Sequence, residues 1–231
     1  AVGGSGTSRT VTLTPSLNQT GTANITVTVS DGSLTSQTTF TLSVTSVNDA
    51  PTLTAIDDLT IDEDTVTAPI TFTVSDVDSA IADLTVSVAT DNTAMIPRAN
   101  IDLSTIAADG TCTLTLTPVA NSYGSANITV TVKDAGGKLS TETFRLTVTA
   151  VNDAPTLSAI DAQTTNEDTA KTMYVTVSDI DNSYAQLTLS AEKSTNIALL
   201  DLSDISISGT GVSRTVILTP KANQNGATNV T

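Results

Sequence analysis

Acidic side chains recur at fixed places along this 231-residue sequence, and their spacing suits metal binding. Two carboxylates stand two residues apart at Asp76 and Asp78, and again at Asp179 and Asp181. Each pair follows a short acidic cluster, and each repeat of the pattern begins with an Asn-Asp pair. The recurring candidate metal ligands are Asn48, Asp49, Glu63, Asp76, Asp78, Asn152, Asp153, Asp179 and Asp181.

Carboxylates crowded together repel one another, and each then resists ionisation unless a cation compensates the charge. Calcium takes six to eight oxygen ligands from carboxylates, Asn carbonyls and the backbone, whereas magnesium demands strict octahedral geometry and keeps its waters. The plain alternative is turn formation, because Asp is favoured in turns. An Asp-x-Asp pair alone is typical of a turn, but the recurring Glu and Asn-Asp beside it favour a bound Ca²⁺.

Other chemistries find little support in the sequence. There is no His, which removes the commonest general base and the commonest zinc ligand. The only cysteine, Cys112, has no partner for an intrachain disulfide. It aligns with Arg9 and Arg214 in the sister repeats, which predicts a partly exposed position at a strand end. A hydrolase pair of Glu63 and Asp76 is disfavoured because an active site is rarely copied along a chain, so we expect no enzyme.

The charge balance limits the partners of the chain. There are 24 acidic against 9 basic residues, a net charge of −15. Nucleic acid is therefore a poor partner, because phosphate binding needs clustered Lys and Arg. An anionic membrane surface would also repel the chain, and no run of 18 apolar residues exists that could span a bilayer in this segment.

Internal repeats organise the chain. The sequence Val-Asn-Asp-Ala-Pro begins at Val47 and returns at Val151, which gives about 104 residues per repeat. A second block, Thr-Pro-x-x-Asn-x-x-Gly, begins at Thr14, Thr117 and Thr219. The predicted domains are the C-terminal part of a first repeat at 1–46, a complete repeat at 47–150 and a truncated third repeat at 151–231.

Short stretches of alternating apolar and polar residues predict the strands that position the acids. Such alternation indicates strands with one buried face. The expected strands of the complete repeat are 52–61, 70–74, 84–88, 95–103, 112–116, 128–132 and 144–148. Seven short strands in about 100 residues are typical of an immunoglobulin-like sandwich. We therefore predict an all-β chain of tandem seven-strand sandwiches, with the acids at the two ends where repeats meet.

The residues around these acids resemble a known family. Thr60-Ile-Asp-Glu-Asp-Thr65, Val74-Ser-Asp-Val-Asp-Ser79 and Val-Asn-Asp-Ala-Pro together look like a cadherin-type repeat, and more closely like the cadherin-like repeats of very large bacterial surface adhesins. The resemblance implies calcium between repeats. It places one site at Glu63, Asn152, Asp153, Asp179 and Asp181, and another at Asn48, Asp49, Asp76 and Asp78. The Asp-Arg-Glu motif of cadherins is missing here, which implies fewer ions per junction.

The expected function is therefore mechanical: an extracellular, calcium-rigidified stalk, adhesin or fibre at a cell surface, whose partners are neighbouring repeats or identical chains. Two alternatives stay open. One is an adhesive domain that binds a ligand directly. The other is a filament subunit, in which the late strands at 1–46 and the early strands at 151–231 of two chains complete one sandwich.

Several further residues are expected to be structural. The Asn of each Thr-Pro block is expected to cap its own loop, with ligation of a metal as the alternative; these are Asn18, Asn121 and Asn223. Asp31 and Asp134 stand beside Gly and are expected to form hairpin turns.

Overall fold

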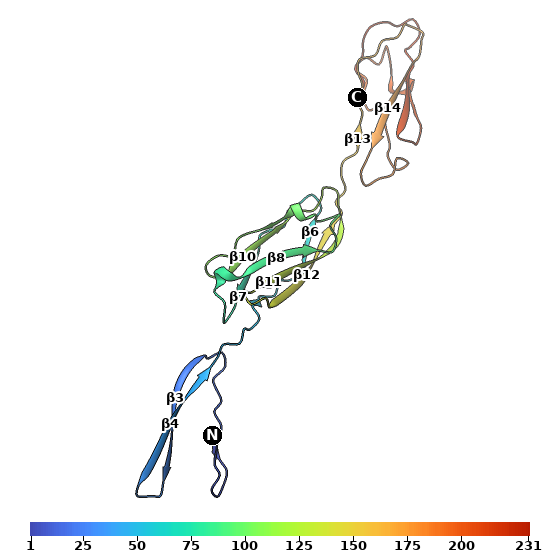
Figure 1. Cartoon of the computed structure of the whole chain (residues 1–231). Coiled ribbons are helices and arrows are strands. Elements are labelled where there is room, and N and C mark those ends of the chain that lie inside the picture. Colours follow the sequence, from blue (N-terminus) through green and yellow to red (C-terminus); the bar gives the residue numbers. More distant parts are fainter. The chain divides into compact units, whose positions relative to one another are not determined.

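The computed structural model describes residues 1–231 and consists of sixteen strands and three short 3-10 helices (Figure 1). It divides into two compact units, Ala1–Ala150 and Val151–Thr231. The all-β fold class predicted from the alternating pattern is confirmed. No helix in the structure is long and apolar enough to cross a membrane.

Residues 47–150 form a sandwich of two four-stranded sheets. One sheet has the order β5 (Thr52–Leu53), β7 (Ile70–Ser75), β10 (Thr111–Leu116) and β9 (Ile101–Leu103). The other has the order β6 (Leu59–Asp62), β12 (Leu139–Thr149), β11 (Gly124–Lys133) and β8 (Thr85–Thr90). Two 3-10 helices, η1 (Ile81–Asp83) and η2 (Arg98–Asn100), lie in the connections. This strand order is that of an immunoglobulin-like sandwich.

The first predicted strand, 52–61, separates into two pieces that belong to different sheets. β5 pairs antiparallel with β7, whereas β6 pairs parallel with β12. Of the predicted strand at 95–103, the first three residues form a turn, the next three form η2, and only the last three form β9. Four of the other predicted strands, 70–74, 112–116, 128–132 and 144–148, lie within observed strands, and the fifth, 84–88, overlaps β8 but begins one residue before it.

The alternating residues of the sandwich build its core. Along β10 every second side chain is buried, and Leu114 and Leu116 are fully enclosed. Phe72 from one sheet and Ile128 and Phe144 from the other are at most 2% exposed. A core of Val, Ile and Leu needs only these two Phe rings because β-branched side chains pack well on a pleated surface.

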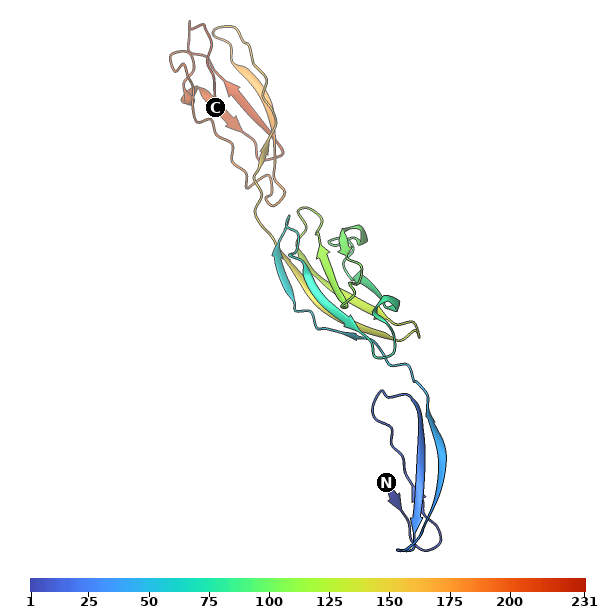
Figure 2. The ribbon, with the colours of Figure 1, turned by 90° about the vertical axis from the view of Figure 1, so that its left-hand side faces the viewer.

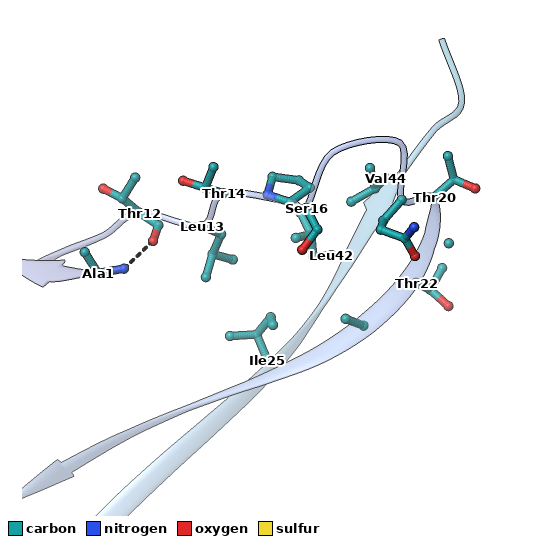
Figure 3. Close-up of a pocket in the computed structure, with 14 residues that line it drawn as sticks. Ala1, Thr12, Leu13, Thr14, Ser16, Thr20, Thr22, Ile25, Leu42 and Val44 are labelled. Carbon is teal, nitrogen blue, oxygen red and sulfur yellow. Dashed lines mark hydrogen bonds between the residues drawn. The ribbon is translucent and has the colours of Figure 1, made fainter. Parts of the chain in front are cut away.

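Residues 1–46 contain a short pair, β1 (Val2–Gly3) with β2 (Thr10–Val11), and a long hairpin, β3 (Gly21–Ser30) with β4 (Thr35–Val44). Figure 2 shows the hairpin as a curved two-stranded ribbon with the N-terminal segment running beside it. Figure 3 shows Ile25 of β3 with Leu42 and Val44 of β4 at an open pocket beneath the segment from Thr12 to Ser16.

The second unit, Val151–Thr231, has one four-stranded sheet with the order β13 (Thr156–Leu157), β14 (Lys171–Ser178), β16 (Ser213–Leu218) and β15 (Ile205–Ser208). It corresponds to the β5-β7-β10-β9 sheet of the complete repeat. One 3-10 helix, η3 (Leu202–Asp204), precedes β15, and Asp201 caps its start. The buried apolar side chains of the sheet are valines: Val175, Val177 and Val216 are 2%, 6% and 8% exposed.

Each Thr-Pro block forms the same tight loop. Its Asn is left-handed in all three copies, with φ of 56° at Asn18 and Asn121 and 55° at Asn223. A left-handed backbone is uncommon for residues other than Gly, and Asn is among those that tolerate it. The main-chain N–H of Asn121 donates to Asp64 Oδ1 at 2.9 Å, and that of Asn223 donates to Asp168 Oδ1 at 2.8 Å. In these two copies the loop is therefore capped by an acid that lies 57 and 55 residues earlier in the chain.

The prediction that Cys112 is partly exposed is wrong: this side chain is fully buried, and burial raises the pKa of its thiol. The position faces the core in both repeats. In the second unit Arg214 fills it at 3% exposure, and its guanidinium donates to the carbonyls of Tyr184 at 2.6 Å and Leu187 at 3.1 Å. A buried cation is tolerated there because backbone oxygens satisfy its donors.

Candidate metal centre

The Asp-x-Asp pair of the complete repeat follows β7, where the sheet ends. Asp76 Oδ1 accepts hydrogen bonds from the N–H groups of Asp78 and Ser79, both at 2.7 Å. This is the turn geometry that Asp favours. The other carboxylate oxygen, Asp76 Oδ2, is buried and has no hydrogen-bond partner. A buried carboxylate oxygen without a partner is costly, so this atom fits a cation ligand.

Asp78 fastens the segment that leads into the repeat. Its Oδ2 accepts the N–H of Asp49 at 2.6 Å, and its Oδ1 accepts the hydroxyl of Ser46 at 3.2 Å. The carboxylate therefore holds the linker backbone beside the end of β7. Hydrogen bonds to an ionised acceptor are short and strong. Asp78 therefore fixes the backbone position from which the side chains of Asn48 and Asp49 extend.

Asn48 connects this linker to a third loop. Its Nδ2 donates to Asp134 Oδ2 at 2.7 Å and to the carbonyl of Asp49 at 3.0 Å. Gly136 makes room for the amide, because a Cβ at that position would lie 2.5 Å from Asn48 Oδ1. Hydrogen bonds of Asp78 and Asn48 thus join three segments at one end of the sandwich. These segments are the linker before the repeat, the turn after β7 and the turn between β11 and β12.

Asp134 was interpreted from the sequence as a turn former, and the structure gives it a second role. It is only 3% exposed, and its Oδ1 accepts the N–H of Lys138 at 2.8 Å. Burial opposes its ionised form, but the hydrogen bonds from Asn48 and from the turn backbone outweigh burial and lower its pKa. The sequence signal was its recurrence as Asp31, which alone could not reveal the contact with Asn48.

The second unit repeats much of this arrangement. Asp179 Oδ1 accepts the N–H groups of Asp181 and Asn182, both at 2.8 Å, and Asp181 Oδ2 accepts the N–H of Asp153 at 2.6 Å. Burial would raise the pKa of Asp179, but these amide hydrogen bonds outweigh it and lower the pKa. Asn152 Oδ1 accepts from Asn182 Nδ2 at 3.1 Å, so in the second unit the linker Asn is held by the residue that follows the Asp-x-Asp pair.

Glu63 lies at the opposite end of the complete repeat and is 3% exposed. Its N–H donates to the carbonyl of Thr149 at 2.9 Å, beyond the parallel pairing of β6 and β12. The site predicted for Glu63 with Asn152, Asp153, Asp179 and Asp181 draws residues from both units, so its assembly stays a prediction. No group of three or more His, Cys, Asp or Glu side chains lies together as a metal cluster.

Residues 48–147 match the protein-family model described as Bacterial Ig domain. The match covers the two-sheet sandwich and supports the immunoglobulin-like part of the fold prediction. No curated protein sequence matches the chain.

Solved structures similar to this chain include immunoglobulin domains of titin and cadherin domains of protocadherins. The titin M3 domain is 14% identical over 42% of this chain and 95% of its own length, with a TM-score of 0.33. The protocadherin gammaB7 EC3-6 structure is 21% identical over 88% of this chain and 50% of its own, with a TM-score of 0.48. The protocadherin gamma B2 domain 3-6 structure is 18% identical, with a TM-score of 0.45 over 87% of this chain and 49% of its own. The chain thus spans about half the length of these protocadherin structures.

Proposed function

We propose that these immunoglobulin-like repeats are rigid spacers of an extracellular stalk, adhesin or fibre, and that calcium at the repeat ends stiffens them. The observation that carries the proposal is the buried, unpartnered Asp76 Oδ2, which lies in the turn that also positions Asp78. The linker residues Asn48 and Asp49 are held at the same end of the sandwich by Asp134 and Asp78.

In the first unit the proposed ligands are oxygens of Asn48, Asp49, Asp76, Asp78 and Asp134. In the second unit they are oxygens of Asn152, Asp153, Asp179 and Asp181. Calcium accepts Asn and backbone carbonyls and water beside carboxylates, so a site with few acids can still reach six ligands. Glu63, at the far end of a repeat, is the residue that we propose completes the site of the repeat that follows.

The stiffening is electrostatic. The chain carries a net charge of −15, and its linker acids would repel the acids of the turn they approach. Without a cation, single hydrogen bonds such as Asp49 N–H to Asp78 hold the linker. With a cation, several ligands from the linker and the turn share one ion, and bending the linker then requires breaking metal–oxygen bonds. Extracellular modules bind calcium at about 10⁻⁴–10⁻³ M, which suits the outside of a cell.

The first test is thermal melting of the chain with calcium and with a chelator. At about 1 mM free calcium and a dissociation constant of about 10⁻⁴ M, mass action contributes roughly 1.4 kcal/mol per site. We expect the transition that reports on residues 47–150 to move to higher temperature with calcium. Identical melting curves in calcium and in chelator would exclude the calcium proposal.

A matched pair of variants locates the site. Asp76→Asn removes charge from the carboxylate whose Oδ2 is buried, and it should weaken calcium binding at least tenfold by calorimetry. Asp102→Asn removes the same charge from an exposed residue of β9, far from the linker in the sequence, and should leave the affinity unchanged. Equal losses in both variants would mean that calcium responds only to the net charge of the chain.

A further inference from the structure

We propose that the parallel pair of β6 and β12 is a clamp that carries tension through the complete repeat. This role rests on the proposed function, because a spacer in a stalk is pulled from its two ends. β6 lies near the start of the repeat and β12 at its end, and the two strands are hydrogen-bonded neighbours in one sheet (Figure 1). Every other strand pair in the structure is antiparallel.

The chain enters and leaves this sandwich at opposite ends. Before the first strand, Asn48 Nδ2 donates to Asp134 Oδ2 in the turn between β11 and β12, so the linker enters beside that turn. β12 starts from the same turn and has eleven residues, which at about 3.3 Å per residue span roughly 35 Å. Tension on the repeat therefore pulls β6 toward the entry end and β12 toward the exit end.

The direction of this pull decides how the hydrogen bonds of the pair fail. Parallel strands that are pulled from opposite ends slide along each other. The bonds across the four residue pairs, from Leu59 with Leu146 to Asp62 with Thr149, are then loaded together. A hairpin that is pulled open at its free ends loads one bond at a time. Simultaneous failure has the higher free-energy barrier, because no bond is replaced by a bond to water until all have broken.

Further hydrogen bonds extend the pair at both of its ends. At the start of β6, Asp58 Oδ1 accepts the N–H of Arg145 at 2.7 Å. At the end of β6, Asp62 Oδ1 accepts the hydroxyl of Thr149 at 2.6 Å, and the N–H of Glu63 donates to the carbonyl of Thr149 at 2.9 Å. Both acceptor side chains are carboxylates, which form short and strong hydrogen bonds. The clamp is thus longer than the strand ladder alone.

The core holds both strands of the pair in place. Leu146 and Val148 of β12 are 0% and 2% exposed. Leu59 and Ile61 of β6 pack against the same core. Because protein interiors are close-packed, sliding β6 along β12 would displace these side chains at the same moment as the ladder breaks.

β5 offers less resistance than this clamp. It pairs with β7 over only two residue pairs, so we expect it to separate first and to add a small extension. Failure of the clamp then frees residues 63–145, which at about 3.4 Å per residue lengthen the chain by roughly 280 Å. Unfolding of the complete repeat should therefore appear as one dominant step.

Force spectroscopy of the 231-residue chain in chelator tests the clamp by changing the direction of the pull. Handles on Asp57→Cys and Ala150→Cys pull β6 and β12 from opposite ends. Handles on Asp57→Cys and Lys138→Cys pull both strands from the end where β6 starts, so β6 peels away one bond at a time. All three positions are exposed, and Cys112 is fully buried and takes no handle. The first geometry should need at least twice the force of the second, and equal forces would overturn the proposal.

A matched pair of variants identifies the bonds that carry the load. Thr149→Val removes the hydroxyl that donates to Asp62, and it should raise the unfolding rate at a fixed force at least tenfold when the strands are pulled from opposite ends. When both are pulled from the same end, the change should be less than twofold, because this bond is loaded last. Thr143→Val removes a hydroxyl of the same strand that lies 3.1 Å from Thr129, outside the clamp, and should change the rate less than twofold in both geometries. An equal effect of Thr149→Val in both geometries would contradict the clamp.

The clamp itself needs no metal, so its test and the calcium test can fail separately. If the two pulling directions differ in chelator while melting is the same with and without calcium, the clamp stands and the calcium proposal fails. If calcium raises the melting temperature while the two pulling directions need equal force, the calcium proposal stands and the clamp is excluded.

Discussion

The hairpins β3–β4 and β11–β12 have nearly the same sequence but different surroundings. Both pair over ten residue pairs, and both carry alternating Ile, Val, Phe and Leu on one face. In the complete repeat that face is closed, and Phe144 is 1% exposed. In residues 1–46 it is largely open, and Phe40 is 44% exposed. Alternation therefore specifies a strand and its faces, while burial requires an opposite sheet.

This difference has energetic consequences. An isolated two-stranded hairpin is at best marginally stable in water, and a hydrophobic face needs further strands or another layer to cover it. The β11–β12 hairpin obtains both from β8, β6 and the facing sheet. The β3–β4 hairpin has only its own ladder and the segment beside it (Figure 3).

The largest contrast is expected for the two Phe rings. Phe144→Ala should destabilise the complete repeat by about 3–5 kcal/mol, because it leaves a cavity in a closed core. Phe40→Ala should cost less than about 1 kcal/mol, because that ring is already largely in water. Native-state hydrogen exchange of the amides in β11 and β3 measures both changes in one chain. Similar losses at the two positions would show that residues 1–46 have a covered core.

The two hairpin-turn acids provide a second contrast, in the response to acid. The folded pKa of Asp134 is lowered, so its stabilising effect is present above the unfolded pKa, about 3.9, and is lost as pH falls through the folded value. Asp134→Asn should therefore flatten the loss of stability of the complete repeat below about pH 4.

Asp31→Asn is the matched control. Its pKa is also lowered, by the N–H groups of Leu34 and Ser33, but the loop is exposed and has no Asn48 beside it. It should leave the acid response of residues 47–150 unchanged. Denaturant unfolding between pH 2 and pH 7, followed by hydrogen exchange of β11, separates the two variants. If Asp134→Asn leaves the acid response of residues 47–150 unchanged, other carboxylates must cause that response.

Two sequence patterns, period-two alternation and the alignment of repeats, predict different parts of the fold. Period-two alternation encodes which side chains face inward, so the strands around Phe72, Leu114 and Ile128 were predictable. It does not encode which sheet a strand joins, so the division of 52–61 into β5 and β6 was not. Alignment of Cys112 with Arg214 suggested exposure, because it could not show the carbonyls that satisfy a buried guanidinium.

The candidate metal centre was predictable to a similar extent. Repetition picked out Asp76 and Asp78, because spacing survives in sequence while neighbouring surface residues drift. It could not separate the oxygen that forms the turn, Asp76 Oδ1, from the buried Oδ2 that lacks a partner. Asp134 was treated as a turn residue because its contact with Asn48 joins positions 86 residues apart.

The smallest effect is expected on the outer faces of the two hairpins, where they should behave alike. The hydroxyls of Thr26 and Thr39 lie 2.9 Å apart, and those of Thr129 and Thr143 lie 3.1 Å apart, both across the ladder. Cross-strand pairs of this kind contribute roughly 0.2–1 kcal/mol. A double-mutant cycle to Ala at each pair, read by hydrogen exchange, should give coupling energies that agree between the hairpins. Because this face is away from the core in both, a large difference would mean that the closed core also changes the geometry of the ladder.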